Sequence, residues 1–188
     1  MNSGMLKMAV YSLREYYNNA DEIVQNVINH AALAATAAAL SGAIPGAGGA
    51  IAATVSIGFI VKMYFSLGNM LGIRLGNGVL KALASAIVAD LAGSVAAVLA
   101  VAPALSFVPG LGTLGAVSIL GLTSFCYVYL AGVIYIKMVG TLLKAGKSID
   151  HMTEKELKNA ASKETSSMNM KAAVKEASSA FKASKKTP

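Results

Sequence analysis

The chain has 188 residues, of which 55% are hydrophobic and 13% are charged, against roughly 25% charged residues in typical globular domains. A single cysteine, Cys126, excludes an intramolecular disulfide and any metal centre built from several cysteines. The formal net charge is +7, and residues 141–188 hold most of it, with ten lysines and five acidic residues. This composition argues against an ordinary water-soluble domain, which needs a polar outer surface.

Residues 1–20 form a polar or amphipathic N-terminal segment, which precedes the long apolar part of the chain. No residue carries a formal charge between Glu22 and Lys62, or between Asp90 and Lys137, windows of 39 and 46 residues. Each window contains a similar short stretch, "AIPGAGG" at 43–49 and "FVPGLGT" at 107–113. Because proline disfavours helix at the preceding residue and glycine tolerates a chain reversal, each window predicts helix, tight turn, helix.

The predicted fold is therefore all-α, with two apolar helical hairpins that form a divergent repeat within a membrane-associated domain at residues 21–145. Helix is favoured over strand because the four arms are long and rich in alanine and leucine. The predicted turn residues are Pro45, Gly46, Gly48, Pro109, Gly110 and Gly112.

The connector between the hairpins, "SLGNMLGIRLGNG", places Gly68, Gly72 and Gly76 at four-residue spacing. If this segment is helical, the three glycines line one side and allow another helix to approach closely. The alternative is that the glycines form a loop between the hairpins, since glycine is a poor residue for helix interiors.

The tail, residues 146–188, is expected to be basic and partly helical or disordered. A Thr-x-x-Glu capping box at 153–156 predicts the start of one helix. A second helix follows Ser167, with an apolar face formed by Met170, Val174, Ala177 and Phe181. The lysines expected to contact lipid headgroups or a partner are Lys171, Lys175, Lys182, Lys185 and Lys186. The alternative for this helix is a solvated chain end.

A helix needs about 20 mostly apolar residues to cross a bilayer, and the 26 uncharged residues at 111–136 are the best candidate. The hairpins either insert into a membrane, fully or as wedges, or pack as a water-soluble bundle that oligomerises. If they insert, the basic residues that flank them predict the inner membrane and cytoplasmic termini. These flanking residues are Lys62, Arg74, Lys81, Lys137 and Lys144.

Asp90 lies among apolar residues in "AIVADLAGS". Such a carboxylate is either near the membrane interface or a costly buried group that needs a partner. The interfacial position is favoured over a role in conducting protons or ions.

No motif in the sequence predicts catalysis, a cofactor or a metal site. The "GLGTLG" stretch at 110–115 matches a dinucleotide fingerprint in letters only, because it follows a helix and no acidic residue occurs between Asp90 and Asp150. His30 and His151 are the only histidines and are not at metal-ligand spacing. The basic tail lacks the interleaved aromatic residues that nucleic-acid binding favours.

Three stretches together resemble the YcjF-type helical domain, a domain of unknown function found in bacterial proteins, often after a small GTPase domain. They are "ADEIVQNVINHAALAATAAALSGAIPGAGG", "VKMYFSLGNMLGI" and "FVPGLGTLGAVSILGLTSFCYVYLAGVIYI", which span roughly residues 20–140. The resemblance implies an all-helical, membrane-associated module linked to GTPase-driven functions. This sequence has no GTPase domain, so the resemblance implies a separate GTPase as a possible partner and assigns no catalytic residue.

The leading hypothesis is a non-enzymatic, membrane-associated protein that shapes a membrane, acts as a scaffold or recruits a partner. It would form a homo-oligomer packed through glycine and alanine faces. One alternative is a pore-forming or toxin-like protein whose hairpins insert from a soluble state. A second alternative is a soluble helical adaptor.

Overall fold

The computed structural model describes the chain except residues 1–3, 42–47, 102–111 and 186–188. The described part is all-helical and contains no strand, which confirms the expected fold class. The elements are α1 (Met5–Tyr11), α2 (Ala20–Ser41), α3 (Gly48–Leu71), α4 (Asn77–Val101), α5 (Gly112–Lys144), the 3₁₀ helix η2 (Ile149–His151), α6 (Glu154–Ser166) and α7 (Met170–Ser184).

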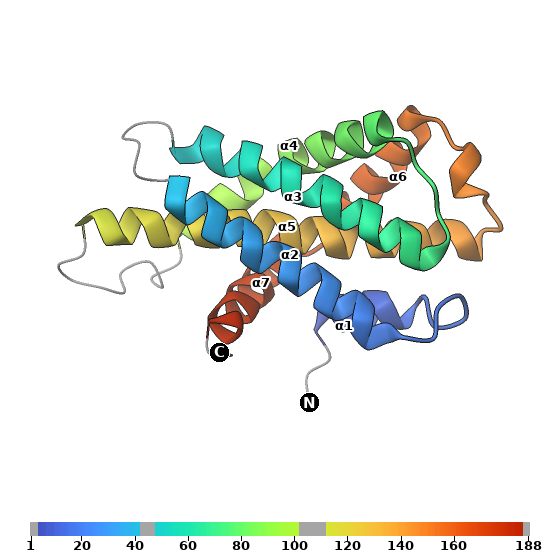
Figure 1. Ribbon diagram of the computed structural model, residues 1–188, viewed down its shortest axis with the longest axis horizontal. Helices are drawn as coiled ribbons and strands as arrows, with labels where there is room; N and C mark the ends of the chain where they lie inside the picture. Colours follow the sequence, from blue (N-terminus) through green and yellow to red (C-terminus); the bar gives the residue numbers. More distant parts are fainter. Residues whose placement is uncertain (1–3, 42–47, 102–111, 186–188) are drawn as a thin grey trace.

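The longest helix, α5, lies at the centre of the bundle, and the other helices pack around it (Figure 1). In the most apolar 18-residue window of α5, 78% of the residues are buried. The corresponding windows of α2, α3 and α4 are only 33%, 33% and 39% buried. A helix that is apolar nearly all round requires apolar neighbours on every side, and α5 obtains them from the protein itself.

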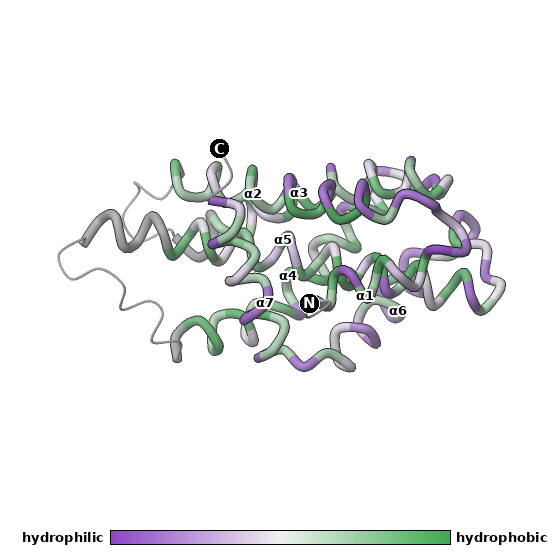
Figure 2. Tube along the Cα trace, turned by 90° about the horizontal axis from the view of Figure 1, so that it is seen from below, coloured by the Kyte–Doolittle hydropathy of each residue, from purple (hydrophilic) through white to green (hydrophobic). Residues whose placement is uncertain are grey.

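Both helical hairpins point in the same direction. The C-terminal ends of α2 and α4 and the N-terminal ends of α3 and α5 lie at one end of the bundle, on the left in Figures 1 and 2, which we call the turn end. The connections from α3 to α4 and from α5 to α6 lie at the opposite end, which we call the charged end because it carries Arg74, Lys81, Lys144 and Asp150.

Two of the six predicted turn residues lie at the turn end. Gly48 and Gly112 are the first residues of α3 and α5. Pro45, Gly46, Pro109 and Gly110 lie outside the described residues, so their role in the turns stays a prediction.

Gly68, Gly72 and Gly76 do not share a helix face, so the helical alternative for the connector is wrong. Gly68 is the only one of the three within a helix, and Gly72 ends α3 with a φ of +70°, which glycine adopts without strain. The Ile73 N–H donates to the Gly68 carbonyl at 2.8 Å, and the Gly72 N–H donates to the Asn69 carbonyl at 3.4 Å. This is the Schellman pattern, in which the chain reverses and the last helical carbonyls keep partners.

The glycines that permit close helix approach lie on α5 instead. A Cβ atom at Gly132 would lie 2.7 Å from Val27 Cγ1 of α2 and 3.3 Å from Met63 Sδ of α3. A Cβ atom at Gly121 would lie 3.1 Å from the Ala35 carbonyl oxygen. These two positions bring α2 and α3 directly against the backbone of α5.

Hydrogen bonds also join α3 to α5 inside the core. The hydroxyls of Ser56 and Ser124 lie 2.8 Å apart, and both residues are fully buried. The Tyr64 hydroxyl donates to the Ala131 carbonyl at 3.0 Å, and its ring stacks on that of Tyr135 with centroids 4.3 Å apart. Pairing satisfies these groups where water cannot reach them.

The tail begins with a helix whose capping is local. The Thr153 hydroxyl accepts from the Glu156 N–H, and the Thr153 N–H donates to the Glu156 carboxylate at 2.8 Å, so the predicted capping box is confirmed. Hydrogen bonds from Thr153 lower the pKa of the Glu156 carboxyl. The cap therefore contributes to folding stability above the pKa that Glu156 has in the unfolded chain. This contribution is lost as the pH falls through the lower pKa that Glu156 has in the folded chain.

Both tail helices pack on the hairpins, α6 against α4 and α5, and α7 mainly against α5. Glu176 of α7 accepts hydrogen bonds from the Met5 N–H at 2.7 Å, the Leu6 N–H at 3.2 Å and the Tyr129 hydroxyl at 2.8 Å. Gly4, the N-cap residue of α1, has no side chain, so Glu176 provides the acceptor for the first N–H groups of that helix. One carboxylate thus joins α1, α5 and α7.

We expect Gly132→Ala to lower the free energy of unfolding by about 1–3 kcal/mol, because the added methyl group overlaps Val27 and forces α2 away from α5. The matched control is Gly58→Ala on α3, where no described atom lies within 4 Å of the added Cβ. The control should be neutral or up to about 1 kcal/mol more stable, because alanine favours helix. Chemical denaturation followed by circular dichroism measures both, and equal stabilities would contradict the close packing at Gly132.

Candidate functional site

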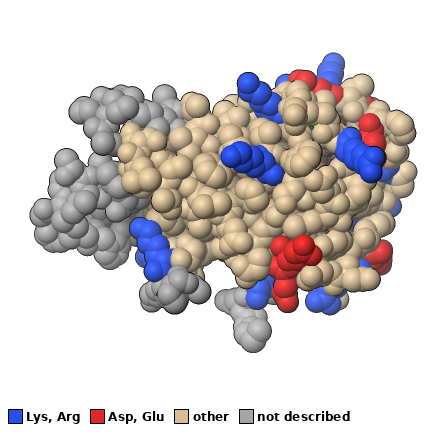
Figure 3. All heavy atoms as spheres, viewed as in Figure 1, with Lys and Arg blue, Asp and Glu red and all other residues tan. Residues whose placement is uncertain are grey.

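The outer surface of the hairpins carries few charged residues and several exposed large hydrophobic side chains. Among large hydrophobic side chains, Leu40 is 78% exposed, Leu33 is 58% exposed and Phe65 is 55% exposed. In Figure 3 the acidic residues on the visible face lie in the half toward the charged end, and the charged residues drawn in the other half are basic. Exposed hydrophobic side chains on a surface with few charges indicate contact with a membrane or a partner.

Four helices are long and apolar enough to cross a bilayer: Ala20–Ser41, Ala52–Leu71, Asn77–Leu99 and Ile119–Lys144. Their mean hydropathies over the best 18 residues are 1.3, 1.3, 2.0 and 1.9. Their length, composition and exposed apolar faces indicate a membrane-associated helical protein.

Asp90 lies about halfway along α4 and is exposed on the outer side of the bundle. No ion pair involves it among the described residues. Lys62, in the middle of α3, is also exposed, and its ammonium lies 5.6 Å from the centroid of the Phe59 ring. A long lysine side chain can extend toward a polar region, whereas the short Asp90 side chain needs water or a partner nearby.

The exposed face of α4 carries a row of small residues around Asp90. Ser85, Ala89, Gly93 and Ala97 follow one another at four-residue spacing, and all four are exposed. No described atom lies within 4 Å of a Cβ atom built at Gly93. The sequence does not reveal this row, because alanine and glycine occur on every face of α4. The outer face can be told from the packed face only by the solvent exposure of its residues in the structure.

The basic helix α7 has the two faces expected from the sequence. Val174 and Ala177 are buried, and Met170 and Phe181 are partly buried against the core. The Phe181 ring packs on that of Phe125 of α5, with centroids 5.3 Å apart. The lysines on the other side are exposed, and their contact with lipid headgroups or a partner stays a prediction. They are Lys171, Lys175, Lys182 and Lys185, whereas Lys186 lies outside the described residues.

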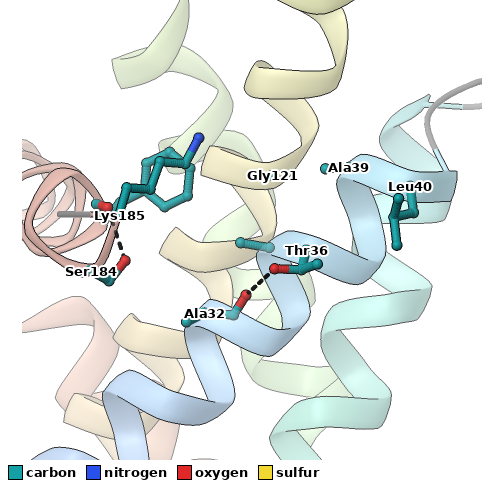
Figure 4. Close-up of a pocket in the computed structure, with 9 residues that line it drawn as sticks. Ala32, Thr36, Ala39, Leu40, Gly121, Ser184 and Lys185 are labelled. Atoms are coloured by element: carbon teal, nitrogen blue, oxygen red, sulfur yellow. Dashed lines mark hydrogen bonds between the residues drawn. The ribbon is translucent and has the colours of Figure 1, made fainter. Parts of the chain in front are cut away.

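A shallow apolar cavity lies where α7 meets α2 and α5. Figure 4 shows its floor, formed by small residues of α2 and by Gly121, with Lys185 on the opposite side. Its volume is about 270 Å³. The Lys185 ammonium lies 4.4 Å from the centroid of the Phe181 ring. This cation–π contact stabilises the positive charge next to an apolar surface. The cavity has apolar walls and one cation, so it favours an apolar group over a polar substrate.

Histidine, cysteine and acidic side chains do not gather into a metal site in the described part of the chain. That part contains no cluster of three histidine, cysteine or acidic residues that could hold a metal ion. His30 Nδ1 lies 2.8 Å from the Asn26 carbonyl oxygen, and the Cys126 thiol has the Ser178 hydroxyl as a hydrogen-bonding partner. A hydrogen bond to Glu22 raises the pKa of the half-buried Tyr17. Each of these contacts has a structural role within or between helices.

Comparison of the chain with models of protein families, with curated proteins and with solved structures gives no match. The resemblance to the YcjF-type domain therefore stays a prediction, as does the division of the chain at residues 20 and 146.

Proposed function

We propose that this protein is a non-enzymatic helical membrane protein, which inserts its two hairpins with the turn end first and acts as a scaffold that shapes the membrane or recruits partners. The observation that carries the proposal is the low burial of three apolar helices. About two-thirds of the residues in the most apolar 18-residue windows of α2, α3 and α4 are exposed or half-buried after the chain has folded. Acyl chains would cover this surface, which water solvates poorly.

The charge distribution supports an orientation with the charged end in the cytoplasm, at the inner membrane in a bacterial cell. Arg74 and Lys81 lie in the α3–α4 connection and the start of α4, and Lys137 and Lys144 lie toward the end of α5. Basic residues that flank membrane segments favour the cytoplasmic side. A partner would then bind the charged end or α7, and the resemblance described above makes a separate GTPase one such candidate. Nucleic acid is not proposed as a partner.

The row of small residues on α4 supports a homo-oligomer. In a bilayer, helices associate through small residues that let their backbones approach. Asp90 lies beside this row, and a second copy would shield its carboxylate from lipid and offer it polar partners.

The membrane proposal predicts that the full chain stays in the membrane fraction through washes with high salt and alkaline carbonate, and is released by detergent alone. Salt removes proteins held by charge, and carbonate removes proteins held at the surface, whereas hairpins in the acyl region resist both. Fractionation of expressing cells followed by immunoblotting measures this. Release by salt, or a soluble particle from the start, would contradict insertion and favour the soluble adaptor.

We expect Gly93→Leu to reduce chemical crosslinking between copies in membranes by at least several-fold, because the larger side chain separates the α4 backbones. Gly58→Leu, on the exposed face of α3, is the matched control and should crosslink like the unmodified chain. Circular dichroism of both variants in detergent confirms that each has kept its helices. Unchanged crosslinking in Gly93→Leu would mean that α4 is not the contact between copies.

One observation favours a second candidate function, a pore-forming protein that inserts from a closed state. The central helix α5 is sheltered on all sides, and α7 covers it through Phe181 on Phe125 and through Glu176 on Tyr129. Separation of α5 from the other helices would require α7 to leave this position, because α7 covers it, whereas the scaffold keeps α7 in place.

Ser178→Cys distinguishes the two functions, because the side chain of residue 178 on α7 neighbours the single cysteine, Cys126, on α5. Oxidation should form a disulfide that holds α7 on α5, and reduction should release it. For the scaffold we expect no release of dye from anionic vesicles in either state. Dye release by the reduced variant that oxidation blocks would instead support the pore-forming function. Ser178→Ala controls for loss of the hydroxyl.

A further inference from the structure

A second pocket lies at the charged end, where the α3–α4 connection crosses over α5. Its volume is about 290 Å³. Phe65 and Leu75 contribute apolar walls, Asn69 and Arg74 contribute polar groups, and Tyr135 of α5 lines it from inside the bundle. The pocket is therefore amphipathic, and it lies where the apolar helices meet the charged connections.

The hydroxyl of Tyr135 is buried and has no hydrogen-bond partner among the described residues. Its neighbour Tyr64, stacked on it, donates to the Ala131 carbonyl at 3.0 Å. Buried hydroxyls are almost always paired, because an unpaired one retains the cost of removal from water. An acceptor atom brought by a ligand in the pocket would satisfy this hydroxyl.

Arg74 places a cation at the same pocket. Its backbone N–H donates to Asp150 Oδ1 at 2.6 Å, which holds the connection against η2. No hydrogen bond or ion pair of its guanidinium occurs within the described part of the chain. Asp150 is the acidic residue next to this site, and its bond to the Arg74 N–H occupies one carboxylate oxygen. The guanidinium is left available to an anion, and its fork of donors suits phosphate oxygens.

We propose that this pocket binds the phosphate and glycerol region of one phospholipid molecule. The phosphodiester pairs with Arg74, an ester oxygen of the glycerol accepts a hydrogen bond from Tyr135, and the acyl chains leave along the exposed face of Phe65. The assignment rests on the proposed membrane location, which would place the charged end at headgroup depth. A bound lipid would stabilise the α3–α4 connection and hold it against α5.

The test uses the full chain, purified in a non-ionic detergent, stripped of lipid and titrated with dioleoylphosphatidylglycerol. Native mass spectrometry measures the fraction that carries one lipid, and thermal unfolding measures the stabilisation that the lipid produces. We expect Arg74→Gln to weaken lipid binding about 10-fold and Tyr135→Phe to weaken it about 3- to 10-fold, since each removes one polar contact. Lys81→Gln and Tyr127→Phe are the matched controls and should bind like the unmodified chain, because neither Lys81 nor the buried Tyr127 lines the pocket.

Tyr135→Phe also provides a check that does not depend on binding. Without lipid it should be as stable as the unmodified chain or more stable, since it removes a hydroxyl that has no partner. Tyr64→Phe should be less stable, because it loses the bond to Ala131. If Tyr135→Phe lowers stability without lipid as much as Tyr64→Phe does, the hydroxyl already has a partner and the lipid assignment is overturned.

Two further results would overturn the lipid site. One is equal lipid binding by Arg74→Gln, Tyr135→Phe and their controls. The other is the same stabilisation by inorganic phosphate alone, which would make the pocket a site for a free anion. The same variants, fractionated with carbonate, separate the two proposals. Retention in the membrane together with failed lipid binding contradicts only the lipid site, whereas carbonate release of the unmodified chain contradicts the proposed membrane location itself.

Discussion

The burial of α5 is the constraint on which the rest of this structure depends. Its apolar window has no polar face to turn toward water, so every neighbouring helix is arranged to cover it. Gly132 and Gly121 let α2 and α3 approach its backbone, and the paired hydroxyls of Ser56 and Ser124 align α3 with it. These short contacts determine where the remaining helices can pack.

Covering α5 leaves α2, α3 and α4 with outer faces that carry few charges. Their exposed residues mix apolar side chains, such as Leu33, Leu40 and Phe65, with uncharged polar ones, such as Asn29 and Thr54. A surface of this kind is stable against acyl chains or another copy of the chain and unfavourable against water. The helix ends next to both predicted turns lie at one end of the bundle, and the charged connections lie at the other, so the two ends of this surface differ in charge.

The tail is held to the core by specific polar contacts. Glu176 joins α7 to the first turn of α1 and to Tyr129, and Glu164 accepts from Thr141 at 3.0 Å and lies 3.4 Å from the Lys137 ammonium. The helices α1 and α7 are therefore coupled to the middle of α5, and α6 is coupled to α5 near the charged end. A change at that end, such as partner binding or lipid binding beside Arg74, would act on the tail and the hairpins together, because they share one central helix.

The sequence by itself determined what depends on neighbouring residues: the long apolar helices, the capping box at Thr153 and Glu156, and the apolar stripe of α7, since each rests on spacing within one element. Only the tertiary structure decided which glycines lie at helix contacts, because an open position such as Gly58 and a packed one such as Gly132 differ in what other helices bring near them. It also decided that Glu176 accepts hydrogen bonds from two backbone N–H groups of α1, which lie 170 and 171 residues away along the chain. In the same way, it placed the Tyr135 hydroxyl, which has no hydrogen-bond partner among the described residues, in the pocket that Arg74 lines. Such contacts join distant segments, so no local pattern reveals them.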